Sequence, residues 1–233
     1  RYKGKPLVKI LNREMILRVA DICAKVVNKK DLYIATDSNK ISKIVNDAGY
    51  KTIMTSSNCL TGTDRVAEAS RKINSDIYIN VQGDEPTINP KDIRKVIKAK
   101  VKNPNHVVCG YDKIHKFENP NNINLPKVVL NKKDELIYIS RAAVPSTKKK
   151  VKYVEYLKQV CIYGFKKSDL KKFKSRKKSY VESLEDIEIL RFFDLGVKIK
   201  MIKLNSNSVA VDEISYVKKA EKLLKEKLKN GKK

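Results

Sequence analysis

The sequence predicts an α/β fold with a mixed, mostly parallel sheet flanked by helices. Short apolar runs alternate along the chain with longer segments that carry apolar side chains at helical spacing. Such alternation is typical of parallel strands joined by helical crossovers. The apolar run at 32–35 ends at Thr36-Asp37-Ser38, which looks like a strand meeting a helix cap, and the run at 77–81 is closely followed by a carboxylate, Asp84. Polar residues at this place are typical of the carboxyl edge of an open α/β sheet.

The elements follow in order along the chain. We expect helices where apolar residues recur every three or four positions, at 15–27, 41–48, 63–73, 91–102, 179–193 and from 214 onward. We expect strands at short runs rich in β-branched and aromatic residues, at 32–35, 51–54, 76–81, 107–111, 127–130, 136–139, 160–165 and 197–204. Together they predict a single domain, with residues 112–180 as an excursion from the main sheet.

Local signals fix several of these boundaries. Gly49 closes the helix at 41–48, since glycine is favoured just past a helix end. The turn-like residues 131–134 join two strands into a hairpin. Ser179 and Glu182 have the spacing of a capping box, which opens the helix at 179–193.

Composition narrows the class of protein. With 233 residues, 41% of them hydrophobic, the chain can bury a core. No apolar run approaches the roughly 20 residues of a membrane helix, and no signal peptide is recognisable. We therefore expect a cytoplasmic protein without a membrane partner. Four widely spaced cysteines and two histidines predict reduced thiols and no zinc site, while oxygen-ligated metals stay open.

The formal net charge of +26 points to anionic partners. Most of the positive charge is lysine, spread along the whole chain, and there is no tryptophan and no recognised nucleic-acid motif. Nucleic acid is therefore not the expected partner. A basic surface also suits an enzyme whose substrates are anions.

Two carboxylates are candidate metal ligands. Gln82-Gly83-Asp84-Glu85-Pro86 follows the strand at 77–81, so Asp84 lies where an Asp can hold Mg²⁺ against substrate phosphates. Val209-Ala210-Val211-Asp212 repeats the pattern late in the chain. If Asp84 and Asp212 meet in space they form a magnesium site. Taken alone, either motif is equally an acidic turn after a strand.

A third motif, Gly62-Thr63-Asp64-Arg65, stands at a loop-to-helix transition. Backbone N–H groups at a helix start attract anions or polar base edges, and Arg65 adds positive charge. A capped helix without a ligand is the structural alternative.

These motifs belong to a longer series. In chain order they are Gly4-Lys5-Pro6-Leu7, Ala35-Thr36-Asp37, Met54-Thr55, Gly62-Thr63-Asp64-Arg65-Val66-Ala67-Glu68, Asn80-Val81-Gln82-Gly83-Asp84-Glu85-Pro86, Tyr138-Ile139-Ser140-Arg141, Ile162-Tyr163-Gly164, Glu182-x-x-Glu185-x-x-Glu188-x-x-Arg191 and Val211-Asp212. The series covers essentially the whole chain and resembles that of the CMP-Kdo synthetases (3-deoxy-manno-octulosonate cytidylyltransferases).

The resemblance implies a nucleotidyltransferase-type (Rossmann-like) fold, a homodimer and a Mg²⁺ cofactor. It implies that CMP passes from CTP to the anomeric hydroxyl of a 3-deoxy-ulosonic acid, Kdo or a close relative, with loss of pyrophosphate. Such a product serves bacterial-type surface polysaccharide or lipopolysaccharide synthesis. Catalysis would depend on positioning and charge neutralisation.

The resemblance also implies roles for single residues. The implied catalytic residues are Asp84, Lys5 and Asp212, and the first and last of these hold the metal. The implied nucleotide-binding residues are Arg1, Lys5, Gly62, Thr63 and Arg65. The implied sugar-binding residues are Gln82, Arg141, Tyr163 and Glu188. Arg141 suits a carboxylate through its planar fork. The excursion at 112–180 would serve sugar binding and dimerisation.

The chain departs from the family pattern in three places. Only Arg1-Tyr2-Lys3 precedes Gly4, so we expect the N-terminal strand and part of the phosphate loop to be missing. Gln159 stands where the family commonly has His, and Ile189 where Gln is typical. Both lie in the region expected to read the sugar, which favours Kdo or a modified relative as acceptor.

Two other functions stay open. The shortened start is consistent with an inactive paralogue or a fragment of the family. The net charge is consistent with a basic polyanion-binding protein. At the level of residues, Tyr163 is equally a core aromatic of its strand, and the alternative for Arg141 and Glu188 is a surface ion pair or a charge on a helix face.

Overall fold

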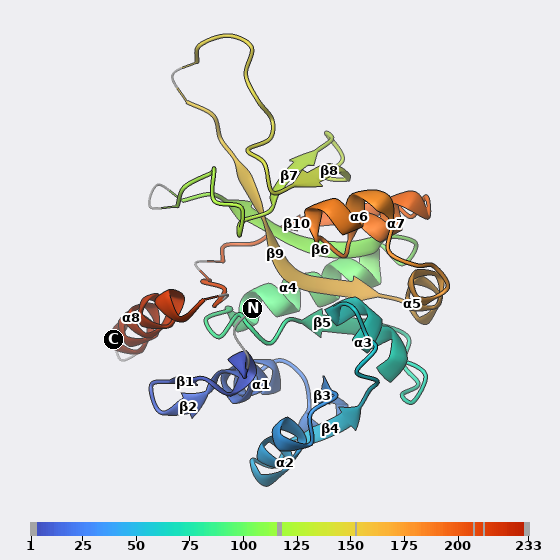
Figure 1. The fold of residues 1–233 in the computed structure, drawn as a ribbon, viewed down its shortest axis with the longest axis vertical. Coiled ribbons are helices and arrows are strands. Elements are labelled where there is room, and N and C mark those ends of the chain that lie inside the picture. Colours follow the sequence, from blue (N-terminus) through green and yellow to red (C-terminus); the bar gives the residue numbers. More distant parts are fainter. Residues whose placement is uncertain (1–3, 116–117, 152, 207, 212, 231–233) are drawn as a thin grey trace. The chain divides into compact units, whose positions relative to one another are not determined.

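The structure is a computed structural model that describes residues 4–115, 118–151, 153–206, 208–211 and 213–230. Contacts divide the chain into two compact units (Figure 1). Unit 1 comprises Arg1–Cys59, Val81–Arg94 and Ser206–Lys233, and unit 2 comprises Leu60–Asn80 and Lys95–Asn205. No helix among the described residues combines the length and the apolarity that crossing a membrane demands.

Unit 1 contains a parallel two-stranded sheet joined by a helical crossover. Its elements are η1 (Lys5–Leu7), β1 (Lys9–Ile10), β2 (Arg13–Glu14), α1 (Met15–Ala24), η2 (Lys29–Asp31), β3 (Tyr33–Thr36), α2 (Asn39–Asp47), β4 (Lys51–Met54) and α8 (Ile214–Asn230). Strands β3 and β4 pair in parallel, as the order strand–helix–strand predicts. A core cluster joins α1, β3 and α2, and its buried members are Leu17, Ala20, Ile34, Val45 and Tyr50.

Unit 2 contains the larger sheet and most of the helices. Its elements are α3 (Gly62–Ala69), β5 (Tyr78–Val81), α4 (Pro90–Lys102), β6 (Val107–Lys113), β7 (Lys127–Leu130), β8 (Leu136–Ser140), β9 (Leu157–Phe165), α5 (Lys167–Lys174), α6 (Tyr180–Glu185), α7 (Leu190–Asp194) and β10 (Ile199–Lys203). Two of these elements, β5 and α4, extend across a unit boundary in the sequence. Figure 1 shows the long segment between β8 and β9 projecting from the sheet.

The six-stranded sheet has the order β10-β6-β9-β7-β8, with β5 on β9. It is mixed, as predicted: β10 and β6 pair in parallel, while β6–β9, β7–β9 and β7–β8 are antiparallel. The antiparallel share is larger than the sequence suggested. It arises inside the excursion at 112–180, where β7 and β8 form the expected hairpin and β9 returns beside β6.

The predicted long helix at 179–193 is wrong. It is two short helices, α6 and α7, because Asp186 has a left-handed backbone (φ 48°) that ends α6. The capping box of Ser179 and Glu182 is confirmed at its start. Helix α5 was not predicted. Only two of its apolar side chains, Leu170 and Phe173, are buried, and they stand among many lysines. Two residues are too few for a helical pattern to be recognised in the sequence.

A fully buried lysine ties α4 to α5. Lys100 is 0% exposed and donates to the carbonyls of Pro104 (3.3 Å) and His106 (2.6 Å) and to the Asp169 carboxylate (3.0 Å). Buried charges are tolerated when they are paired and hydrogen-bonded. Lys100 therefore satisfies carbonyl oxygens beyond the end of α4, which no helical amide can reach.

Tyr50 gives unit 1 a testable pH dependence. Its hydroxyl donates to Asp21 Oδ1 at 2.7 Å, and burial followed by this carboxylate raises the pKa of Tyr50 to about 12. An unfolded tyrosine ionises near pH 10, so its stabilising contribution is complete below pH 10 and is lost towards pH 12. The stability deficit of Tyr50→Phe should therefore shrink by about 1.4 kcal/mol between pH 8 and pH 11.

Urea unfolding followed by circular dichroism at several pH values measures this difference. The exposed Tyr153→Phe is the control, expected to stay within about 0.5 kcal/mol of the parent chain at each pH. A Tyr50→Phe deficit that is constant with pH would contradict the prediction.

Candidate functional site

The predicted site residues divide between the two units, and each group has its own structure. Unit 1 holds Lys5, Gln82 and Asp84, while unit 2 holds Gly62, Thr63, Arg65, Arg141, Tyr163 and Glu188. Two predicted residues, Arg1 and Asp212, lie outside the described residues.

In unit 1, Lys5 and Asp84 form an ion pair. The Lys5 Nζ atom lies 2.8 Å from Asp84 Oδ2, and the two side chains are 25% and 22% exposed. Lys5 opens η1 after Gly4, whose left-handed backbone (φ 80°) suits glycine. Asp84 follows the end of β5. The structure thus brings together two of the three residues that were predicted to be catalytic.

A second segment of unit 1 holds the loop after β5 in place. The Val211 N–H donates to the Asp84 carbonyl at 2.8 Å. Next to it, the Ser208 hydroxyl donates to Glu85 Oε2 at 2.6 Å, and the Val209 N–H donates to Thr87 Oγ1 at 2.8 Å. The backbone at Asp84 is therefore fixed by the residues that directly precede Asp212 in the sequence.

Gly83 lets this loop approach helix α1. A Cβ atom built on Gly83 would lie 2.8 Å from the Ile16 Cδ1 atom, which is closer than side-chain carbons normally come. The close approach that the glycine permits is thus made to a partly buried side chain that packs against the core cluster of the same unit. Gln82, one residue earlier, accepts the Glu85 N–H through its carbonyl.

A divalent ion fits this part of unit 1 only together with a substrate. Among the described residues no cluster of three or more His, Cys, Asp or Glu side chains could hold a metal. Mg²⁺ is usually bound by one or two carboxylates plus substrate phosphates and water, so it needs no cage made by the protein alone. The carboxylate of Asp84, partly exposed and balanced by one lysine, is compatible with that kind of binding.

In unit 2, the start of helix α3 already has an anionic partner. Thr61 caps the helix by accepting the Asp64 N–H at 3.1 Å, and the Thr63 N–H donates to Glu188 Oε2 at 2.8 Å. Helix N-termini attract negative charge. Here that charge is the buried carboxylate of Glu188, which brings Thr63 and Glu188 together, although the sequence placed them with different ligands.

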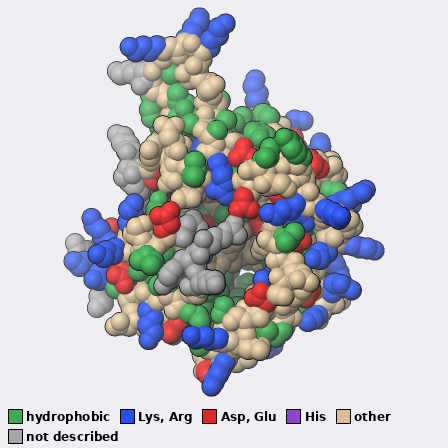
Figure 2. Space-filling view, in the orientation of Figure 1, with side chains coloured by type: hydrophobic (Ala, Val, Ile, Leu, Met, Phe, Trp, Pro, Cys, Tyr) green, Lys and Arg blue, Asp and Glu red, His purple; other side chains and the backbone are tan. Residues whose placement is uncertain are grey.

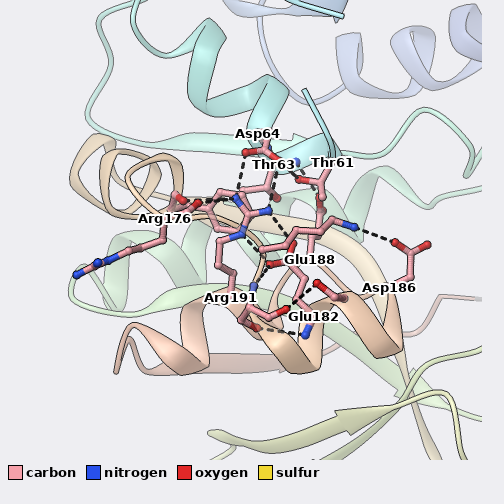
Figure 3. A network of polar contacts seen from close by, with 12 residues as sticks. Thr61, Thr63, Asp64, Arg176, Glu182, Asp186, Glu188 and Arg191 are labelled. Atoms are coloured by element: carbon pink, nitrogen blue, oxygen red, sulfur yellow. Dashed lines mark hydrogen bonds and ion pairs between the residues drawn. The ribbon is translucent and has the colours of Figure 1, made fainter. Parts of the chain in front are cut away.

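Arg191 lies at the centre of a buried network beneath this helix start (Figure 3). Its guanidinium, 2% exposed, binds Glu182 through two hydrogen bonds of 2.7 Å and Asp64 at 3.1 and 3.3 Å. The same group lies 3.8 Å above the Phe173 ring. The network joins α3, α5, α6 and α7, and so it fixes the helix that carries Thr63 and the two helices that flank Glu188.

Arg141, at the end of β8, is held by backbone oxygens. Its guanidinium donates to the carbonyls of Glu185, Ile123 (2.7 Å) and Asp186 (3.0 Å). A guanidinium has five N–H groups, so among the described residues two are left for a ligand. Arg141 is therefore not the surface ion pair that was the alternative: its fork is oriented by the main chain.

Tyr163 and Ile189 lie in the core of unit 2. Tyr163 is 2% exposed, stacks on Phe165 with ring centroids 5.9 Å apart, and accepts a hydrogen bond from the Gln159 amide at 3.2 Å. Burial raises the pKa of Tyr163 well above the usual range. Ile189, 1% exposed, belongs to the same core cluster. Of the two substitutions in the region expected to read the sugar, Gln159 is thus the partly exposed one.

Several buried charged residues of unit 2 have structural roles that were not predicted from the sequence. Glu182 and Arg191 appear in the E-x-x-E-x-x-E-x-x-R spacing, and that spacing was a usable signal for a charge network. Lys127, which is fully buried, gave no signal, because lysine is normally exposed.

Comparison with known proteins identifies the family. A family model described as cytidylyltransferase matches residues 1–199 of the 233. The chain belongs to the cytidylyltransferase family. The prediction of a nucleotidyltransferase is therefore confirmed.

Three curated relatives of this cytidylyltransferase share the name 3-deoxy-manno-octulosonate cytidylyltransferase. A 3-deoxy-manno-octulosonate cytidylyltransferase from Escherichia coli is 31% identical over 98% of this chain and 92% of its own length. One from Nitratiruptor sp. is 34% identical over 94% and 92%. A mitochondrial one from Arabidopsis thaliana is 32% identical over 97% and 80%. The resemblance read from the sequence motifs is thus confirmed.

Solved structures agree on the fold of the cytidylyltransferase. A CMP:2-keto-3-deoxy-manno-octonic acid synthetase complexed with CTP superimposes with a TM-score of 0.88 at 30% identity, covering 97% of this chain and 94% of that one. An inositol-1-phosphate CTP transferase from T. maritima, 16% identical, superimposes with a TM-score of 0.66 over 96% and 88% and shares the fold alone. The predicted nucleotidyltransferase-type α/β fold is confirmed.

Proposed function

We propose that this cytidylyltransferase transfers CMP from CTP to the anomeric hydroxyl of Kdo and releases pyrophosphate. The observation that carries the proposal is the ion pair between Lys5, in η1, and Asp84, which follows β5. This pair offers a cation for phosphate and a carboxylate for a metal. The names of the relatives support the donor and the acceptor. The motif series supports the same assignment over the whole chain.

In unit 1 we assign the triphosphate to Lys5 and Asp84. Lys5 Nζ, partly exposed, would leave Asp84 for a phosphate oxygen, since an ammonium binds phosphate as a point charge. Asp84, with Asp212 as its proposed partner, would hold Mg²⁺. When bound, that ion neutralises charge on the triphosphate and on the departing pyrophosphate. Arg1 and Gln82 keep the nucleotide and sugar roles that the resemblance implies.

In unit 2 we assign the sugar acid to Arg141 and Glu188. The two remaining N–H groups of Arg141 suit the planar carboxylate of Kdo. The Glu188 carboxylate, anchored by the Thr63 N–H, would accept a sugar hydroxyl. Gly62, Thr63 and Arg65 keep their proposed place beside the nucleotide. Tyr163 acts through Gln159, whose amide it orients.

At the α-phosphorus the reaction forms one bond and breaks one. The anomeric oxygen of the sugar attacks the α-phosphorus of CTP, the bond from that phosphorus to the bridging oxygen breaks, and pyrophosphate leaves. The proton of the attacking hydroxyl passes to water. Catalysis by the chain's own residues is then positioning and neutralisation by Lys5 and Arg141, a type of catalysis that needs no covalent intermediate.

We further propose a cytoplasmic homodimer that supplies surface polysaccharide or lipopolysaccharide synthesis. Exposed apolar side chains lie on β8 and α6 of unit 2: Ile137, Tyr138, Tyr180 and Leu184. Figure 2 shows hydrophobic side chains gathered over the β7–β8 hairpin. Such a patch favours burial against a second copy. On the face that Figure 2 shows, Lys and Arg side chains are scattered and do not gather into one patch, so this face does not favour the polyanion-binding alternative.

Pyrophosphate release tests the function directly. With CTP and Mg²⁺ we expect release that depends on Kdo and that is not supported by ATP or GTP. Release without a sugar, or none with Kdo, would overturn the proposal. In the second case a CTP-binding titration distinguishes an inactive paralogue, which fails to bind CTP, from an enzyme for another acceptor. Light scattering of the same sample measures the oligomeric state.

A further inference from the structure

The side chain of Lys127, on β7, is buried, and among the described residues it has no carboxylate partner. The residue is 0% exposed, and its ammonium donates to the carbonyls of Asn122 (3.0 Å) and Arg141. Burial, followed by the charge of Arg141, lowers the pKa of Lys127, while Glu185 raises it. A buried ammonium is costly even when it is hydrogen-bonded. This unfavourable burial occurs at the segment that carries Arg141.

Glu185, at the end of α6, binds the backbone of Arg141 at its N–H group, whereas Lys127 binds it at its carbonyl. Its Oε2 atom accepts the Arg141 N–H at 2.8 Å, and its Oε1 atom accepts the Ser140 hydroxyl at 2.6 Å. The carbonyl of Arg141 is thus bound by a cation and its N–H by an anion. Both peptide planes around Arg141 are fixed by charged side chains, in addition to the three carbonyls that hold its guanidinium.

We propose that Lys127 and Glu185 are positioning residues that fix Arg141 for the carboxylate of the sugar acid. The inference rests on the proposed function, in which Arg141 binds that carboxylate. A bidentate pair between guanidinium and carboxylate depends on the orientation of the fork. The two charges therefore fix the backbone from which the guanidinium extends, and the three carbonyls orient its fork before the sugar arrives, which reduces the cost of ordering on binding.

Lys127→Met removes the ammonium and keeps an unbranched side chain. Because the Arg141 carbonyl loses its partner, we expect the KM for Kdo to rise about tenfold, with kcat and the KM for CTP within about twofold. Glu185→Gln, on a partly exposed side chain, should act in the same direction with less risk to folding. A rise in both KM values, or in neither, would overturn the inference.

Lys100→Met is the matched control. Lys100 is also fully buried and also donates to two backbone carbonyls, and unlike Lys127 it pairs with a carboxylate, that of Asp169. It lies at the end of α4, and none of its contacts among the described residues is with Arg141. We expect it to lower the thermal midpoint as Lys127→Met does, and to leave the KM for Kdo unchanged. An equal rise in that KM would show that lost stability, and not positioning, is the cause.

A substrate analogue provides a second measurement. The C1 amide of Kdo lacks the anionic carboxylate, so the parent enzyme should discriminate strongly against it. In Lys127→Met that discrimination should fall about tenfold, because the misplaced fork gains less from the carboxylate. Unaltered discrimination would contradict the inference. Failure of the proposed function has a different signature: the parent enzyme then does not turn over Kdo, or Arg141→Ala leaves its KM unchanged.

Discussion

Asp84→Asn is expected to lower kcat/KM for CTP by about 10³-fold, while the chain stays folded. The substitution keeps the shape of the side chain and removes the charge that would hold a metal on the triphosphate. Metal-ion stabilisation of a developing charge is worth several kcal/mol, and each 1.36 kcal/mol is a factor of ten in rate. The Lys5–Asp84 pair is partly exposed, so its loss should cost no more than about 1 kcal/mol of stability.

The neighbouring Glu85→Gln is the control. Glu85 is buried, and its carboxylate accepts the Ser208 hydroxyl at 2.6 Å, so this substitution should change stability more than catalysis. Binding of Mn²⁺ in the presence of CTP, followed by electron paramagnetic resonance, gives a readout other than turnover. We expect Asp84→Asn to lose this binding and Glu85→Gln to keep it. If Asp84→Asn retained a tenth of the parent activity, Asp84 would not be the metal ligand.

Arg191→Met is expected to destabilise unit 2 by about 3–5 kcal/mol. It leaves the buried carboxylates of Glu182 and Asp64 without the guanidinium that binds both. It also removes the contact with the Phe173 ring. Lys174, 3.7 Å from Asp64 and 43% exposed, can compensate only part of this loss. Urea unfolding followed by circular dichroism measures the change.

Arg13→Met is the comparison for that experiment. The Arg13–Asp21 pair has good geometry, but its side chains are 39% and 36% exposed. Exposed ion pairs contribute about 0–1 kcal/mol, so this variant should remain close to the parent chain. Similar losses for Arg191→Met and Arg13→Met would mean that burial does not decide the contribution of these pairs.

The sequence predicted the elements whose pattern is local. The order β3, α2 and β4 follows from apolar periodicity, and the capping box at Ser179 follows from two residues three positions apart. The carboxylate after β5 was likewise readable, and the structure pairs it with Lys5. These features depend on near neighbours in the chain, which is why single-sequence patterns reveal them.

Features that depend on distant contacts were not readable. No local signal marks Lys127 as buried, since its partners are carbonyls supplied by other segments. The position of Ile189 in the core and the contact of Glu188 with the Thr63 N–H depend on how α3 packs in unit 2. The sequence also suggested a continuous helix through Asp186, because the residues on both sides of it have helical spacing. The left-handed backbone of Asp186, which tertiary contacts impose, leaves no such signal in the sequence.

The break at Asp186 has a consequence for how this sequence can change. A continuous helix would have used the carbonyls of Glu185 and Asp186 for the amides four residues later. Because the helix stops, both oxygens bind the guanidinium of Arg141, a residue 45 positions earlier than Asp186. Position 186 must therefore keep a residue that adopts a left-handed backbone, such as Asp, Asn or Gly. We expect it to covary with position 141 among relatives, so that neither changes alone.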